Sequence, residues 1–187
     1  IKPLEDLLSA FKQDVVKSRY NTFDEVLDYC TRSANPVGRL VLMIFGCHDD
    51  EFFKYSDKIC TALQLTNFWQ DVEVDLRKDR IYLPEEDIKQ FGYSYRQLEM
   101  QQDNENFREL MKYEAERTQA IFDEGKKLIE LTAGNADTKK LSKELKLTWL
   151  GGTTILAKIK EIDYNVLNQR PTISGFDKLR IFLASRF

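Results

Sequence analysis

The sequence predicts an all-α fold. Apolar residues recur at the three- and four-residue spacing of an amphipathic helix along most of the chain. Signals for strands are nearly absent, because no Asn-Gly or Asp-Gly pair joins two alternating apolar runs, and Gly and Pro are few. Residues suited to helix ends lie between the periodic segments. We therefore expect residues 1–187 to form a single helical domain.

The first three helices are predicted from two apolar stripes and from residues that start helices. One stripe covers residues 4–15 and a second covers residues 23–30. Thr22 or Asn21 can cap the second helix. Pro36 suits the first turn of a third helix, which we expect to end just before a glycine ten residues later.

The rest of the chain predicts longer helices. We expect them over about Asp49–Leu76, from Pro84 to the break at Gly92, over about Asn104–Thr132, over about Thr138–Asn168, and in a short tail helix to Phe187. Two adjacent glycines, Gly151 and Gly152, interrupt the last long pattern at a cost of ~1 kcal/mol each relative to Ala. Close packing or a kink is the expected reason for this pair.

Composition excludes several classes of protein. Twenty-eight basic and 31 acidic residues give a net charge of −3, which argues against a nucleic-acid partner. The longest apolar run, Leu40–Cys47, is much shorter than the ~20 residues of a membrane-spanning helix. Three cysteines without CxxC spacing indicate single thiols in a reducing compartment, so we expect a cytoplasmic protein. The start at Ile1, without Met, is compatible with a fragment.

One segment combines an uncharged run with a polar stripe. Residues 59–70 carry no charge although 32% of the chain is charged, so this helix should be central and buried. At ~100° per residue, four polar side chains fall within an arc of roughly 80°. They are Gln64, Asn67, Asp71 and Asp75. Apolar residues occupy the remaining directions, so the stripe predicts one wall of an interior cavity that supplies oxygen ligands.

The two aspartates of this stripe oppose helix formation. Asp71 and Asp75 repel each other at i,i+4 by ~0.2–0.5 kcal/mol, and the helix dipole disfavours each near the C-terminus by ~0.3–1 kcal/mol. Mg²⁺ between the carboxylates would reverse both effects, and Mg²⁺ prefers such hard oxygen ligands together with phosphates and waters. The alternative is a solvated helix end that is neutralised by nearby cations, which are Arg77, Lys78 and Arg80.

The basic segment after the stripe has two interpretations. Its cations, Arg80 among them, could pair directly with the two carboxylates, or they could bind the oxygens of a phosphorylated ligand that also reaches the metal. Tyr82 adds a neutral donor. Either arrangement explains the charges, but only the second explains the uncharged cavity beside them.

These motifs resemble a known family. The pattern Gln64-xx-Asn67-xxx-Asp71-xxx-Asp75, followed by Arg80-x-Tyr82-x-Pro84, resembles the second aspartate-rich region of the squalene/phytoene synthase family. Residues 33–38 (Ser-Ala-Asn-Pro-Val-Gly) resemble the helix break of that family where small residues face the substrate channel. The words Ser-Ala-Asn-Pro-Val-Gly-Arg and Asn-Phe-Trp-Gln-Asp-Val look most like the hydroxysqualene synthase branch of bacterial hopanoid pathways.

The resemblance implies a class I terpenoid synthase fold, which is a helical bundle around a central apolar cavity. This chain would carry the C-terminal two-thirds or so of the domain and lack the N-terminal helices. Asn67, Asp71 and Asp75 would bind Mg²⁺ that holds an allylic diphosphate, with the two aspartates essential for catalysis. The residues implied to contact the substrate are Gln64, Asn67, Arg80 and Tyr82, joined by Asn35 and Gly38 of the helix break.

The implied reaction is the conversion of presqualene diphosphate to hydroxysqualene, with release of diphosphate and without a nicotinamide reductant. One alternative is the head-to-head condensation of two farnesyl diphosphates to presqualene diphosphate or to a squalene- or phytoene-type product. Another is a non-catalytic scaffold or assembly factor with the same fold. Long isoprenoid substrates partition into lipid, so peripheral contact with the inner face of the membrane is an additional expectation. The oligomeric state is left open.

The chain also departs from the family pattern. The first aspartate-rich helix lies further upstream in the family, and Asp24 and Asp28 sit in the wrong helix to replace it. Gln70 stands where phytoene and squalene synthases commonly carry Arg, which argues against those branches. The catalytic tyrosine is left open, because Tyr29 and Tyr164 are weak candidates for which core packing is the favoured interpretation.

Overall fold

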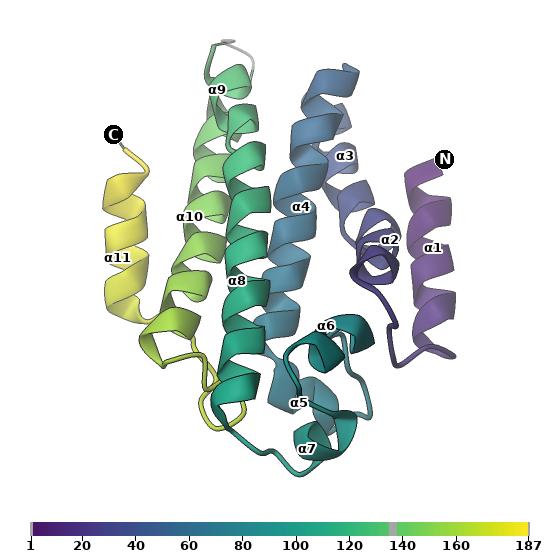
Figure 1. Ribbon diagram of the computed structural model, residues 1–187. Coiled ribbons are helices and arrows are strands. Elements are labelled where there is room, and N and C mark those ends of the chain that lie inside the picture. The colour runs from purple at the N-terminus through teal and green to yellow at the C-terminus, as the bar shows by residue number, and fades with distance from the viewer. Residues whose placement is uncertain (1, 135–137, 187) are drawn as a thin grey trace.

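The structure is a computed structural model that describes residues 2–134 and 138–186, and within these ranges it is built of helices without strands (Figure 1). The all-α prediction is therefore confirmed for the described part of the chain. The helices are α1 (Lys2–Asp14), α2 (Phe23–Ser33), α3 (Asn35–Ile44), α4 (Asp50–Gln70), α5 (Val72–Leu76), α6 (Glu85–Gln90), α7 (Tyr95–Glu99), α8 (Glu105–Gly125), α9 (Lys127–Ala133), α10 (Lys139–Glu161) and α11 (Gly175–Ala184).

Helix α4 is the central element. It packs against α3 on one side and against α8 and α10 on the other, while α1 and α11 form the two edges of the molecule (Figure 1). Its uncharged part is largely buried, as predicted, and Leu65 and Trp69 are fully enclosed. The Trp69 indole donates a hydrogen bond to Thr118 Oγ1 on α8 at 2.8 Å, so the polar edge of this large ring is satisfied inside the core.

The predicted continuous helix over residues 49–76 is wrong at one residue. Asp71 leaves the helical conformation, with φ −107° and ψ 18°, and separates α4 from α5. Its N–H still donates to the Asn67 carbonyl at 2.9 Å, and its own carbonyl accepts from Asp75 N at 2.8 Å. The distortion is thus a local bend in an otherwise helical path, and it lies at one of the predicted metal ligands.

The helices also differ from the prediction in three other places. The helix expected over residues 104–132 is divided at Lys126 into α8 and α9. The last long helix ends at Glu161 rather than near residue 168, because Asp163 and Tyr164 adopt positive φ angles of 54° and 59°. The short helix α7 was not predicted, although Ser94 provides its cap by accepting from Gln97 N.

The basic segment after α5 is fixed in space by backbone pairing with the loop between α1 and α2. Ile81 N donates to Ser18 O at 2.9 Å, and Glu85 N donates to Tyr20 O at 2.9 Å. Thr22 caps α2, as predicted, by accepting from the backbone N–H three residues later. Because these contacts lie on both sides of the segment, residues 80–84 are held against the core rather than forming a free surface loop.

A buried charged triad attaches α6 to α8. Arg117 donates to Asp87 Oδ2 at 2.6 Å and to Glu114 Oε1 at 2.5 Å, and both acids are almost completely buried. The guanidinium also lies 3.4 Å from the centre of the Phe23 ring, a cation–π contact that ties α2 to the same point. The triad therefore fixes the far end of the segment that carries Arg80 and Tyr82.

The glycine pair in α10 is explained by close packing. A Cβ at Gly152 would lie 2.4 Å from Phe122 Cζ and 2.9 Å from Leu63 Cδ2, so a side chain there would displace both neighbours. At Gly151 the nearest atom is Ile173 Cδ1, at the ordinary contact distance of 3.9 Å. The helix continues without interruption through both residues, so packing rather than a kink accounts for the pair.

Several apolar side chains remain exposed on the outer helices. They include Leu8 and Phe11 on α1, Ile44 on α3, and Phe176 and Phe182 on α11. Despite this exposure, within the described ranges no helix is both long enough and apolar enough to span a membrane.

The two glycines of α10 should respond differently to alanine. Gly152→Ala should lower the free energy of unfolding by about 1–3 kcal/mol because the new methyl group overlaps Phe122 and Leu63. Gly151→Ala should raise it by up to about 1 kcal/mol because helix propensity improves without a clash. Urea denaturation of both variants gives the comparison, and equal effects would contradict the packing explanation.

The pH dependence of stability should reveal the buried triad. Burial raises the pKa of Glu114 to about 8, whereas an unfolded chain titrates Glu at about 4.3. The folded state therefore binds the Glu114 proton more tightly than the unfolded state does. Protonation of Glu114 thus stabilises the fold fully below the unfolded pKa, and this stabilisation is lost as pH rises towards 8. Between pH 5 and 8 the wild type should lose roughly 1 kcal/mol or more relative to Glu114→Gln.

The measurement is urea denaturation at intervals across this pH range. Glu116→Gln, which changes an exposed acid on the same helix, is the matched control and should keep the wild-type slope. A Glu114→Gln variant that loses stability in parallel with the wild type would show that Glu114 does not titrate in this range.

Candidate active site

The predicted metal ligands gather where α4 meets α5. Asn67 is exposed on the last turn of α4, Asp71 occupies the bend, and Asp75 lies one turn later on α5. The side chains of Asp71 and Asp75 are 27% and 18% exposed. These residues therefore lie at the boundary between core and solvent, where a soluble ligand can reach oxygen donors that are partly shielded from water.

A groove opens beside this junction, between α4 and α10. It is open to solvent, has a volume of about 420 Å³, and is lined in part by the segment that follows α10. Its lining residues are Leu63, Thr66, Asn67 and Gln70 from α4, Thr148, Gly151, Gly152 and Ile155 from α10, and Arg170, Thr172 and Ile173 from the turn. The groove thus combines three apolar side chains and two glycines with six polar residues, among them Asn67 and Arg170.

The opposite side of the junction is filled by aromatic rings. Tyr82 stacks on Phe68 with ring centres 3.7 Å apart and planes within 7°. The ring centres of Tyr20 and Tyr29 lie 5.5 and 6.0 Å from the centre of the Tyr82 ring. The space between this cluster and Asp75 is only about 10 Å³, which is about one water molecule. The open space therefore lies on the Asn67 side, and the Arg80–Tyr82 side is packed.

Of the three cations after α5, only Lys78 takes the predicted role of pairing with one of the two carboxylates. Lys78 Nζ lies 3.5 Å from Asp75 Oδ1, and Arg77 pairs with Glu73. Arg80 instead donates to the Asp14 carbonyl at 3.2 Å. Partial burial lowers the pKa of its guanidinium, but the neighbouring Tyr82 and Asp14 more than offset this effect and raise the pKa. Direct pairing with the carboxylate at position 75 thus involves the lysine, and Arg80 is anchored to α1.

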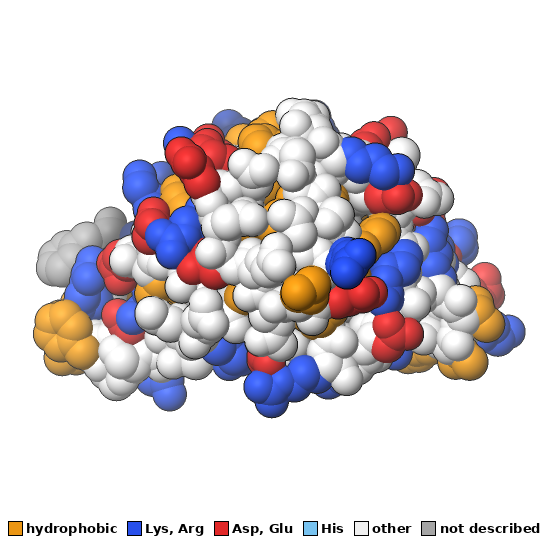
Figure 2. All heavy atoms as spheres, turned by 60° about the horizontal axis from the view of Figure 1, so that its bottom comes forward, with side chains coloured by type: hydrophobic (Ala, Val, Ile, Leu, Met, Phe, Trp, Pro, Cys, Tyr) orange, Lys and Arg blue, Asp and Glu red, His pale blue; other side chains and the backbone are white. Residues whose placement is uncertain are grey.

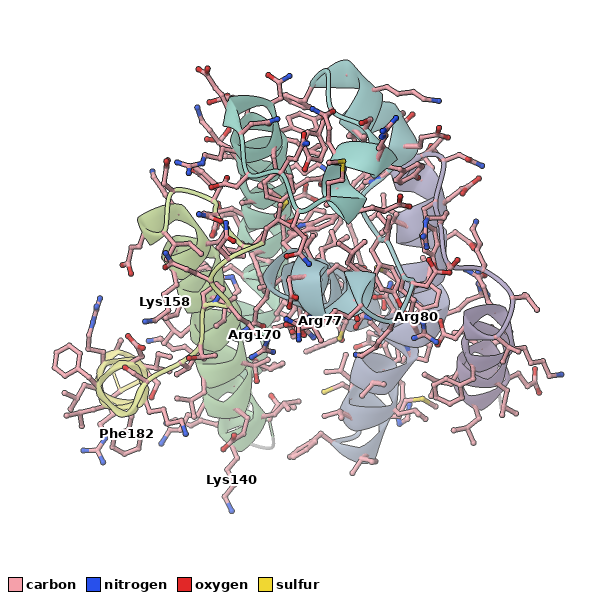
Figure 3. The ribbon with its side chains drawn as sticks, turned by 90° about the horizontal axis from the view of Figure 1, so that it is seen from below. Arg77, Arg80, Lys140, Lys158, Arg170 and Phe182 are labelled. Atoms are coloured by element: carbon pink, nitrogen blue, oxygen red, sulfur yellow. The ribbon has the colours of Figure 1, made fainter. Side chains whose placement is uncertain are left out.

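Two contacts that sequence reasoning missed join the turn after α10 to the bend. Arg170 Nε donates to Asp71 Oδ1 at 2.5 Å, and its Nη2 reaches Oδ2 at 3.2 Å. One residue away, the buried Gln70 amide donates to the Pro171 carbonyl at 2.5 Å. Figure 3 shows Arg170 next to Arg77 in the view from below. The only sequence signal was the Arg170-Pro171 pair itself, since local spacing cannot join positions about a hundred residues apart.

The donors at the junction fit Mg²⁺ in an open site. Burial raises the pKa of Asp75, and the neighbouring Asp71 charge adds to the rise, so the two carboxylates are close enough to repel. A cation between them would relieve this repulsion. Among the described residues, no three His, Cys, Asp or Glu side chains form a closed metal cluster. An Mg²⁺ here would therefore need further ligands, and phosphate oxygens and waters are its usual ones.

The remaining predicted site residues lie elsewhere on α3 and α4. Asn35 is buried, and its Oδ1 accepts a 2.9 Å hydrogen bond from Thr61 of α4. Gly38 allows α3 to approach α4 closely, because a Cβ there would lie 2.5 Å from Cys60 Sγ. Gln64 is half-buried on α4. The structure does not bring Asn35 and Gly38 into the Asp71 cluster, and substrate contact by these three residues stays a prediction.

The two tyrosine candidates differ in position. Tyr29 lies in the aromatic cluster, where its hydroxyl is hydrogen-bonded to Asp14 and contacts Tyr82, and burial raises its pKa strongly. Tyr164 lies beyond the end of α10, against a different pocket that includes Glu116. Tyr29 is therefore the candidate that adjoins the Arg80–Tyr82 segment.

The charges on this end of the molecule are mixed. Figure 2 shows acidic and basic side chains alternating over the visible face, without a continuous basic field.

Comparison with known proteins supports the interpretation of the motifs. Residues 1–177 match the squalene/phytoene synthase family. A 15-cis-phytoene synthase from Synechocystis sp. is 31% identical over 96% of this chain and 55% of its own length. A hydroxysqualene synthase from Sinorhizobium fredii is 44% identical over 50% of this chain and 32% of its own length. The chain thus spans about half the length of these curated relatives or less.

Solved structures share the fold. The squalene synthase HpnC from Alicyclobacillus acidocaldarius superposes with a TM-score of 0.83 at 43% identity, over 88% of this chain and 60% of that one. A dehydrosqualene synthase in complex with ligand gives 0.85 at 22% identity, over 99% and 64%, and this likeness concerns the fold alone. With its class I terpenoid synthase-like helical fold, the chain belongs to the squalene/phytoene synthase family.

Proposed function

We propose that the protein, in its full-length form, is an Mg²⁺-dependent enzyme that converts presqualene diphosphate to hydroxysqualene and releases diphosphate. The observation that carries this proposal is the junction of α4 and α5, where Asn67 lines a groove that includes Leu63 and Ile155, and where Asp71 and Asp75 follow Asn67 at four-residue spacing. A prenyl diphosphate likewise combines polar and apolar parts, a charged head and a long apolar chain.

The groups of this chain would act on the two parts of the substrate separately. Asn67, Asp71 and Asp75 would hold Mg²⁺, which neutralises the diphosphate and makes it a better leaving group. Arg170 stands beside Asp71 and has the planar donor geometry that suits phosphate oxygens. Leu63 and Ile155 line the groove and would keep water from the carbocation that forms when the diphosphate departs.

The choice of the hydroxysqualene reaction rests on local similarity. The relatives with that activity in their names are more than 35% identical to this chain over part of its length, whereas the phytoene synthases are about 30% identical over nearly all of it. Gln70 also replaces the arginine that we associate with the phytoene- and squalene-forming branches. The alternative condensation of two farnesyl diphosphates would use the same groove and the same metal ligands.

A non-catalytic scaffold is the second candidate class. A scaffold could keep the helical fold and the apolar groove while losing the carboxylates. This chain keeps Asn67, Asp71 and Asp75 at four-residue spacing across the junction of α4 and α5. The retention of all three oxygen donors favours a catalytic role.

The first test replaces Asp71 by Asn in the full-length protein. We expect Mg²⁺-dependent release of diphosphate from presqualene diphosphate to fall by about 100-fold or more, equal to roughly 2.7 kcal/mol, with no loss of helical content. Asp24→Asn, in the exposed DxxxD pair of α2, is the matched control and should keep full activity. Undiminished turnover by the Asp71 variant would refute the enzymatic proposal.

A second test separates the two reactions. Presqualene diphosphate and farnesyl diphosphate are supplied in separate incubations with Mg²⁺, and the products are identified by mass spectrometry. We expect hydroxysqualene from the first substrate and no coupled product from the second. A presqualene diphosphate product from farnesyl diphosphate alone would support the condensation alternative instead.

A further inference from the structure

The turn after α10 carries a feature that the proposed reaction does not explain. Arg170 donates a hydrogen bond to each carboxylate oxygen of Asp71, from Nε to Oδ1 at 2.5 Å and from Nη2 to Oδ2 at 3.2 Å. A predicted metal ligand therefore already has a cationic partner. The pair is half-exposed, with 47% of the arginine side chain and 27% of the aspartate side chain accessible. Asp71 is thus neutralised without a metal ion.

A second contact keeps this arginine in place. Gln70 is 9% exposed, and its amide donates to the Pro171 carbonyl at 2.5 Å. Because Pro171 lacks an N–H and has a fixed φ, the peptide that joins it to Arg170 has little freedom once this bond forms. The buried neutral bond and the exposed ionic bond therefore attach adjacent residues of the turn to adjacent residues of the bend.

The bend itself makes the arrangement geometrically available. Asp71 is non-helical, so Gln70 and Asp71 can both reach the same turn although consecutive residues of a regular helix point about 100° apart. The Arg170 side chain also lines the groove beside Asn67. The arginine consequently stands between the open groove and the carboxylate that the metal would use.

We propose that Arg170 is a latch on the metal ligand Asp71 and that Gln70 is the positioning residue that holds the latch closed. A metal ion can use Asp71 fully only after it displaces the guanidinium, so the latch lowers the affinity of the site for metal alone. In this scheme the glutamine, although its side chain lines part of the groove, acts on the metal ligand through Arg170. This inference rests on the proposed function for the metal, whereas the latch itself exists without metal.

The competition is tested by titrating the full-length protein with Mn²⁺ alone, followed by EPR of the free ion. Arg170→Gln should bind Mn²⁺ about two- to fivefold more tightly than the wild type, since half-exposed ion pairs have couplings of this size. Gln70→Met, which keeps the side-chain length but removes the donor, should give a smaller increase. Arg77→Gln is the matched control, because it removes the same charge from a neighbouring arginine that pairs with Glu73.

The metal-free protein supplies an independent readout. In NMR spectra of arginine side chains, the Arg170 Nε–H signal should exchange slowly with water in the wild type. Asp71→Asn should abolish this protection, and Gln70→Met should reduce it while circular dichroism shows an intact fold. Restoring a donor with Gln70→Lys should return part of the protection, which a purely structural role in the core would not do.

The outcomes are distinct. An Arg170→Gln variant that binds Mn²⁺ no more tightly than Arg77→Gln, although Asp71→Asn weakens Mn²⁺ binding, overturns the competition. An Arg170 signal unaffected by Asp71→Asn overturns the latch. If the latch is present but Asp71→Asn leaves Mn²⁺ binding unchanged, then the metal role of Asp71 in the proposed function is wrong, and the competition falls with it.

Discussion

The burial of the uncharged part of helix α4 is the constraint on which the rest of the structure depends. Helix α4 can be central only because its side chains over residues 59–70 need no solvent, apart from a few polar groups that find partners. Once it is central, α3, α8 and α10 must pack around it, and its last turn emerges at one end of the bundle. The charged residues that follow are then placed together at that end, so the position of the site is a consequence of the core.

The fold was predictable because its signals are local. Periodicity, the cap at Thr22 and the proline at the start of α3 each depend on a few neighbouring residues, and the structure confirms them. The bend at Asp71 was not predictable in this way. It coincides with contacts to Arg170 and Pro171, and no pattern of spacing connects residues separated by about a hundred positions.

The candidate site was predictable in part. Asn67, Asp71 and Asp75 recur at four-residue spacing, and this spacing was sufficient to place them at one junction although the helix bends at Asp71; Arg80 and Tyr82 follow directly in sequence. Which side of the junction is open could not be predicted in the same way, because one side is filled by aromatic rings from four separate segments. Tyr20 and Tyr29 supply part of this packing, and their relation to Tyr82 is purely tertiary.

The close approach of α3 and α4 gives the protein built-in chemical reporters. The Cys60 sulfur sits against Gly38, and burial raises the pKa of this thiol to about 11. Since the thiolate is the reactive form, alkylation of Cys60 should be slow while the two helices stay packed and faster when they separate. Labelling kinetics would thus report how often this interface opens, without any engineered probe.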